Sequence, residues 1–184
     1  MGELLAGPYL AACGLLVAAG LPKLRDPLPL VRALRSVGLP IGRTIGTASA
    51  TTRVIAAAEV VLGIAAIARP GTLTAGLVAL AYLAFTSFVA LALAKGGVLA
   101  SCGCFGKPDT PPTRAHLLVT ALLAGAAAAT AVEPSVRLLT AQPGELVTAG
   151  YAVLVAFLAW LVIAVLPTTT PAAVRGPRTA PQEG

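Results

Sequence analysis

Two cysteines separated by a single glycine are the residues of this chain best suited to chemistry. They lie in Ser101-Cys102-Gly103-Cys104-Phe105-Gly106, between two long apolar stretches. Thiol reactivity depends on the thiolate fraction and on access, so a pair at a membrane edge is better placed to react than a cysteine in a core. With this spacing both thiols reach the same mixed disulfide, and a direct disulfide between them is strained, as labile or catalytic disulfides are. Because Gly103 lets the backbone reverse, a tight turn without chemistry is the main alternative to catalytic thiol–disulfide exchange by Cys102 and Cys104.

A soft-metal site is a further alternative. His116 is the only histidine, and with Cys102 and Cys104 it would give three soft ligands. Structural zinc sites use a C-x2-C or longer spacing and four ligands, so metal is not the favoured hypothesis and no resident cofactor is expected. The leading interpretation of His116 is a solvated histidine at the membrane interface.

An acidic residue inside an apolar stretch is the second candidate for chemistry. Glu59 lies among Ala, Val, Leu and Ile, where an ionisable side chain is costly and needs a partner. The nearest candidates are Lys23 and Arg25, at the end of the preceding apolar stretch. We therefore predict an intramembrane polar site of Glu59, Lys23 and Arg25, acting either as an ion pair that docks two helices or as a proton-handling or ligand site.

The composition puts these residues in a membrane protein. Of 184 residues, 57% are hydrophobic and 11% charged, whereas soluble domains are about 25% charged. The net charge of +6 is spread over short loops between apolar stretches, as membrane topology requires. The lipid bilayer is therefore the expected partner, and nucleic acid is not.

The apolar stretches predict an all-α fold. Residues 1–133 should form one membrane domain with spans at about 4–21, 48–68, 73–94 and 115–132. A connector and a fifth span at about 146–166 should fill 134–166, and 167–184 should be a disordered Pro-rich tail. Cys13, inside the first span, is interpreted as an inert small hydrophobe.

A short amphipathic helix is predicted between the first two spans. Asp26-Pro27 is a helix-start signal, and the next turns put an apolar set on one side and Arg32 and Arg35 on the other. The apolar set is Leu30, Val31, Leu34 and Val37. This pattern is typical of a helix that lies on an anionic leaflet.

The distribution of positive charge predicts the orientation. Eleven of the 13 Lys and Arg residues fall in the loop after the first span, the cysteine loop and the tail, and the other two are Arg69 and Arg137. The positive-inside rule therefore puts Cys102 and Cys104 in the cytoplasm. Thiols are kept reduced there, and a cysteine pair is more often transient and catalytic than structural.

Three short motifs in order resemble a known family. They are Gly20-Leu21-Pro22-Lys23-Leu24-Arg25-Asp26-Pro27, Glu59 with Gly63, and Cys102-Gly103-Cys104-Phe105-Gly106. Over about residues 5–132 the chain resembles the MauE family of methylamine utilisation proteins, within the DoxX-like group of four-helix membrane proteins. The fifth span and the tail are additions to that pattern.

The resemblance implies a DoxX-like four-helix bundle in the cell membrane and a role in redox chemistry. Cys102 and Cys104 would be the redox pair, supported by Gly103, Phe105 and Gly106, with Lys23, Arg25 and Glu59 as the polar set. The family is linked to maturation of the disulfide-rich small subunit of methylamine dehydrogenase, with a thioredoxin-like or disulfide-containing partner. The alternative from another class is a non-enzymatic scaffold or carrier that uses Glu59 with Lys23 and Arg25.

Overall fold

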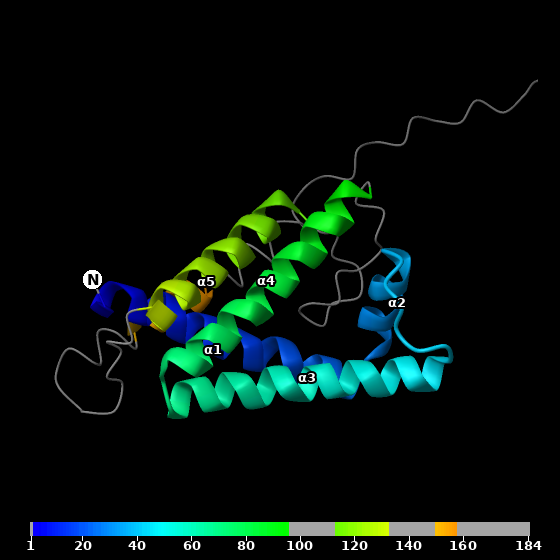
Figure 1. Ribbon diagram of the computed structural model, residues 1–184, viewed down its shortest axis with the longest axis horizontal. Helices are drawn as coiled ribbons and strands as arrows, with labels where there is room; N and C mark the ends of the chain where they lie inside the picture. Colours follow the sequence, from blue (N-terminus) through cyan, green and yellow to red (C-terminus); the bar gives the residue numbers. More distant parts are fainter. Residues whose placement is uncertain (1, 96–112, 133–149, 158–184) are drawn as a thin grey trace, which may run out of the picture.

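The computed structural model describes residues 2–95, 113–132 and 150–157, and all the regular secondary structure in them is helical. The helices are α1 (Gly2–Arg25), α2 (Leu28–Ser36), α3 (Ile45–Ala68), α4 (Thr72–Ala94) and α5 (Arg114–Val132) (Figure 1). Within α1 the stretch Leu5–Arg25, together with α3, α4 and α5, is long and apolar enough to cross a membrane. The prediction of an all-α membrane protein with four spanning helices is therefore confirmed.

Residues 150–157 are also helical and fall within the predicted fifth span. Tyr151 from this segment packs on α1 at Gly7, where an added Cβ would fall on the Tyr151 ring. The rest of the fifth span and the predicted tail lie outside the described residues, so the division of the chain after residue 133 stays a prediction.

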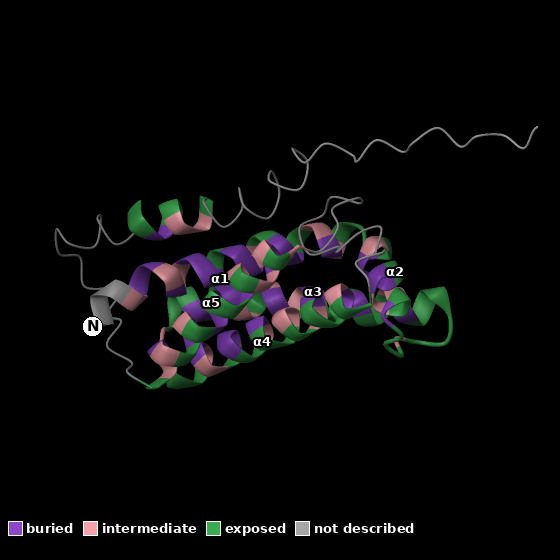
Figure 2. Ribbon diagram, turned by 90° about the horizontal axis from the view of Figure 1, so that it is seen from above, coloured by how far each residue is buried: buried purple, intermediate pink, exposed green. Residues whose placement is uncertain are grey.

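Helix α1 is the central helix of the bundle. More than half of its apolar membrane-spanning stretch is buried (56%), against 28% for the stretches of α3 and α4 and 33% for that of α5. Figure 2 shows buried positions along the length of α1. The largest core cluster joins α1 to α3, α4 and α5. Its members are Tyr9, Ala12, Cys13, Leu15, Leu16, Ala66, Ala75, Val78, Ala79, Tyr82, Leu123, Ala124 and Ala127.

Two glycines set how closely α1 and α3 approach. A Cβ added to Gly63 would lie 2.7 Å from the Cys13 carbonyl oxygen, and one added to Gly20 would lie 2.9 Å from the Ala56 carbonyl oxygen. Both contacts are with backbone atoms, which do not move aside. In lipid, where no hydrophobic force selects helix faces, small residues of this kind let helices pack backbone to backbone.

Helix α1 extends further than its apolar stretch predicts. We expected the span to end at Leu21, before Pro22, but the helix continues to Arg25, and the Asp26 N–H donates to the Pro22 carbonyl at 2.8 Å. Proline lacks a backbone donor and its ring crowds the carbonyl four residues earlier, which can kink a helix without ending it. Lys23 lies in this extra turn.

Helix α2 fills the wide end of the V formed by α3 and α4 (Figure 1). Its Leu30 and Val31 are buried, and Val37, just after the helix, packs with Ala92 and Phe88 of α4. The Lys95 Nζ, at the end of α4, donates to the Val37 carbonyl. The predicted apolar side of α2 thus faces the bundle, while Arg32 and Arg35 are exposed.

Candidate functional site

A buried ion pair joins α1 to α3. Lys23 Nζ donates to both carboxylate oxygens of Glu59, at 2.9 Å to Oε1 and 2.7 Å to Oε2. The two residues are 3% and 6% exposed. A buried charge pair is stable only if its geometry is good and its other donors and acceptors are met, so the surroundings of the ammonium decide what this pair does.

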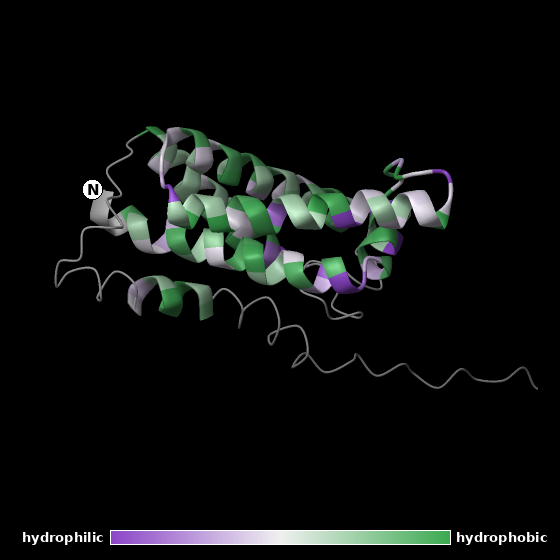
Figure 3. Ribbon diagram, turned by 90° about the horizontal axis from the view of Figure 1, so that it is seen from below, coloured by the Kyte–Doolittle hydropathy of each residue, from purple (hydrophilic) through white to green (hydrophobic). Residues whose placement is uncertain are grey.

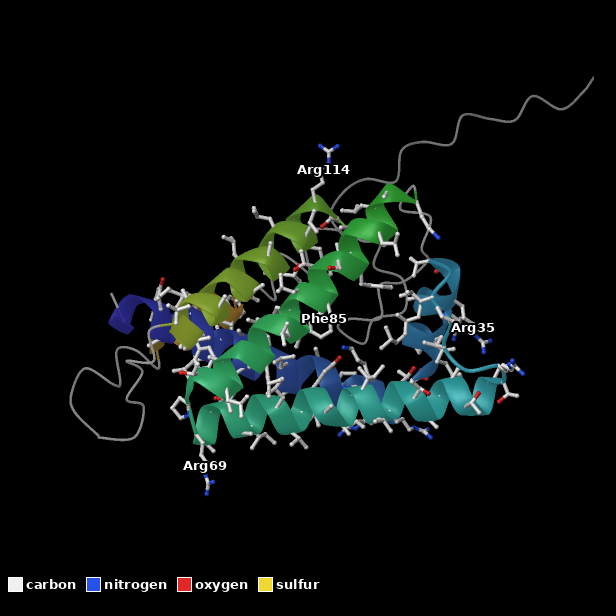
Figure 4. All side chains as sticks on the ribbon, in the orientation of Figure 1. Arg35, Arg69, Phe85 and Arg114 are labelled. Carbon is white, nitrogen blue, oxygen red and sulfur yellow. The ribbon has the colours of Figure 1, made fainter. Side chains whose placement is uncertain are left out.

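An aromatic side chain from α4 completes the environment of the ammonium. Lys23 Nζ lies 4.9 Å from the centroid of the Phe85 ring, within cation–π range, and in Figure 4 Phe85 projects from α4 into the space between it and α3. Phe85 meets Tyr82 edge to face, with centroids 5.7 Å apart. The carboxylate and the ring together satisfy the Lys23 charge inside the membrane.

Tyr82, which contacts Phe85, connects α4 to α1 by a hydrogen bond. Its hydroxyl donates to the Ala12 carbonyl at 2.8 Å, and its side chain is buried. Lys23, Glu59, Phe85 and Tyr82, which we call the three-helix contact, therefore tie α1, α3 and α4 together. This is the geometry of a docking contact whose charges are met within the protein.

Helix phase explains why Lys23 rather than Arg25 reaches Glu59. Two residues along an α-helix turn the side chain by about 200°, so the two cations point to opposite sides of α1. Lys23 is buried against α3, whereas Arg25 is exposed. The register is fixed by Gly20, one turn before Lys23, whose missing side chain lets Ala56 and Glu59 come close.

The sequence reasoning did not include Phe85 and Tyr82 in the polar site. Their spacing, with Phe88, indicated only a packing stripe on one side of α4. An aromatic stripe facing a charged pair would identify these two residues as part of the site. That pattern is visible only once α1 and α4 are known to be in contact, and residue spacing does not reveal this contact.

Cys102, Cys104 and their supporting residues Gly103, Phe105 and Gly106 lie outside the described residues. The described ends of their segment are Lys95, after α4, and Thr113, before α5. Helices α4 and α5 run side by side (Figure 1), and Lys95 contacts Val37, so the end of α4 and the start of α5 lie at the end of the bundle where α2 lies.

The remaining candidate residues are both buried. His116, in the first turn of α5, is 2% exposed, so the interpretation of a solvated interfacial histidine is wrong; α5 turns this side chain into the bundle. Cys13 is a buried free thiol in the main core cluster, as expected for a small hydrophobe.

The model of the family described as methylamine utilisation protein MauE matches residues 1–133, which include the polar pair, the cysteine segment and all four spanning helices. The chain belongs to the MauE family. No curated protein and no solved structure matches the chain.

Family membership confirms the resemblance inferred from the motifs and agrees with the apolar helices in a multi-pass membrane protein. The match ends one residue after α5. Residues 150–157, which pack on α1, thus come from a part of the chain beyond the matched region.

Proposed function

We propose that this protein carries out thiol–disulfide exchange with a partner protein through Cys102 and Cys104. The observation that carries the proposal is the CGC motif in the segment between α4 and α5 of a MauE-family chain. A segment anchored by two packed helices can present two thiols to a partner while the bundle stays intact. Reduction of wrongly paired disulfides during maturation of a disulfide-containing protein, of the methylamine dehydrogenase kind named for the family, is the role this exchange would serve.

The exchange balances as two substitutions at sulfur. One thiolate attacks the partner disulfide, forming a mixed disulfide and releasing one partner thiolate. The second cysteine then attacks the first, closing the Cys102–Cys104 disulfide and releasing the other partner thiolate. The partner gains two electrons, and two protons from solvent, while the pair loses two electrons; a thioredoxin-like dithiol reverses the sequence and restores the pair.

The position of the C-terminal end of α4 limits how far Cys102 can lie from the bundle. Cys102 is seven residues beyond Lys95, so its Cα lies within roughly 25 Å of the Lys95 Cα even in a fully extended chain. The bilayer core is about 30 Å thick, so the pair works at the α2 end of the bundle. The charge distribution supports a cytoplasmic location for that end.

Trapping of the mixed disulfide tests the proposal. Cys104→Ser and Cys102→Ser each remove one thiol, so at least one of them should hold a partner in a disulfide that reductant releases. The control is Cys13→Ser, because the buried thiol of Cys13 is not expected to take part. This variant should trap no partner and should keep full activity. The proposal fails if neither variant traps a protein and the double variant keeps full activity in maturation of the partner.

Thiol labelling of intact cells tests the orientation with the same variants. A membrane-impermeant maleimide should label Cys102 and Cys104 only after the cells are permeabilised. Labelling of intact cells after reduction would put an oxidised pair outside and contradict the cytoplasmic assignment, while leaving the exchange itself in place.

One observation favours a second candidate, a scaffold or carrier without redox chemistry. The buried Lys23–Glu59 pair would then be the essential feature, and the cysteines would only shape a turn. Glu59→Gln would abolish function in protein that still assembles, while the double cysteine variant would be active. Metal bound in a one-to-one ratio to purified protein, and lost in the double cysteine variant and in His116→Ala, would instead indicate the soft-metal alternative.

A further inference from the structure

Three arginines gather at the α2 end of the bundle. Arg32 and Arg35 are one turn apart on the exposed side of α2, so their side chains are neighbours. The Arg35 guanidinium donates to the Thr44 carbonyl at 3.3 Å, which ties α2 to the loop that carries the exposed Arg43. In Figure 4 Arg35 points away from the bundle.

Among the described residues, no carboxylate forms an ion pair with these arginines. The sequence has no Asp or Glu between Asp26 and Glu59, and Glu59 is buried with Lys23. Exposed arginines carried by one short segment gain from an anion that several of them contact. The cluster therefore indicates an anionic ligand.

The surroundings of the arginines indicate that this anion belongs to a lipid. Exposed apolar side chains lie on the same segment: Leu28, Leu39 and Ile45, the last 63% exposed. Facing water they would be unfavourable, but arginines beside exposed Leu and Ile are the composition of a helix that lies in the headgroup layer. Figure 3 shows hydrophilic positions gathered around α2 and its loop to α3, next to the apolar lengths of the spans.

The length of α3 places this segment at the right depth. Its 24 residues extend about 36 Å, which exceeds the hydrocarbon thickness of about 30 Å. The surplus falls at the first turns of α3, beside α2, because Thr47 and Thr51 are exposed polar residues there. Helix α2 is held there by the packing of Val37 on Phe88 and by Lys95.

We propose that residues 28–45 form a binding surface for the headgroups of anionic phospholipids, with Arg32, Arg35 and Arg43 contacting the lipid phosphates. The proposed surface does not depend on thiol chemistry. Its ligand is a lipid of the bilayer that surrounds the spans, since the arginines and the exposed apolar side chains are used together.

Lipid binding by the purified full chain tests this surface. The detergent-solubilised protein is stripped of lipid and titrated with phosphatidylglycerol or phosphatidylcholine, and bound lipid is counted by native mass spectrometry. Phosphatidylglycerol should bind preferentially. Arg32→Gln with Arg43→Gln leaves the Arg35–Thr44 contact in place and should weaken this binding about 25-fold, at about fivefold for each arginine near an anionic surface.

Two control variants separate the charge of the surface from its fold. Arg32→Lys with Arg43→Lys keeps both charges and should retain most of the preference. Arg69→Gln, at the opposite end of the bundle from Arg35 (Figure 4), should bind as the wild type does. Equal affinity for both lipids, or a Gln double variant that binds like Arg69→Gln, would overturn the proposal.

A competition experiment distinguishes the lipid from its headgroup alone. Inorganic phosphate at millimolar concentration should not displace phosphatidylglycerol from the wild type, because it cannot use the exposed apolar side chains. Displacement at that concentration would mean that the arginines bind a soluble anion, and the lipid surface would be rejected.

Discussion

Removing one partner of the Lys23–Glu59 pair should destabilise the bundle more than removing both. Lys23→Met leaves a buried carboxylate, Glu59→Met leaves a buried ammonium, and the double variant leaves two apolar side chains of similar length. Breaking a buried pair costs about 3–5 kcal/mol, whereas replacing both partners with hydrophobic residues is often neutral. The expected order is therefore unusual: either single variant is less stable than the double variant.

The geometry supports this magnitude. The Nζ–oxygen distances of 2.7 and 2.9 Å correspond to a gross attraction of about 6 kcal/mol at an effective dielectric constant near 20. Desolvation of two groups that are 3% and 6% exposed removes much of it. Because the attraction and the desolvation largely offset each other, we expect single-variant losses near the lower limit, about 3 kcal/mol.

Reversible unfolding in mixed micelles, followed by helical circular dichroism against the mole fraction of SDS, measures these differences. Arg53→Gln is the matched control, because Arg53 is a charged residue on α3 that is exposed; it should change the free energy of unfolding by about 0.5 kcal/mol or less. Single-variant losses below about 1 kcal/mol, or a double-variant loss equal to the sum of the two, would refute the assignment of a coupled buried pair.

Two further predictions concern the contacts that hold this pair in place. Gly63→Ala should lower the free energy of unfolding by about 1–3 kcal/mol, because the new methyl group meets the Cys13 carbonyl oxygen at 2.7 Å. The control is Gly14→Ala, which should not lower the free energy of unfolding because no described atom lies within 4 Å of the added Cβ. Equal losses for the two variants in the SDS titration would count against the close α1–α3 approach. Tyr82→Phe should cost about 1 kcal/mol by losing the hydrogen bond to the Ala12 carbonyl, measured by the same titration, and no loss would mean that this bond is not formed.

The class of fold and the motifs follow from the amino-acid sequence alone. Spanning helices need only local apolar content, because every backbone group in lipid must be satisfied within its own helix, so composition is enough to find them. The sides of α2 were predictable for a similar reason: the 3.6-residue period is local, and Leu30, Val31 and Arg32 follow it. The CGC motif and its order after Glu59 were enough to indicate the family.

Only the tertiary structure decided which residues meet. Lys23 and Arg25 were equal candidates for Glu59 in the sequence, and the choice depends on the rotation of α1, which Gly20 and Gly63 fix through backbone contacts with the neighbouring helix. The contact of Phe85 with the Lys23 ammonium and the burial of His116 also depend on how helices far apart in the sequence pack together. In a bilayer the outer surface of a helix is as apolar as its core-facing surface, so hydropathy cannot tell the two apart, and close packing between helices decides.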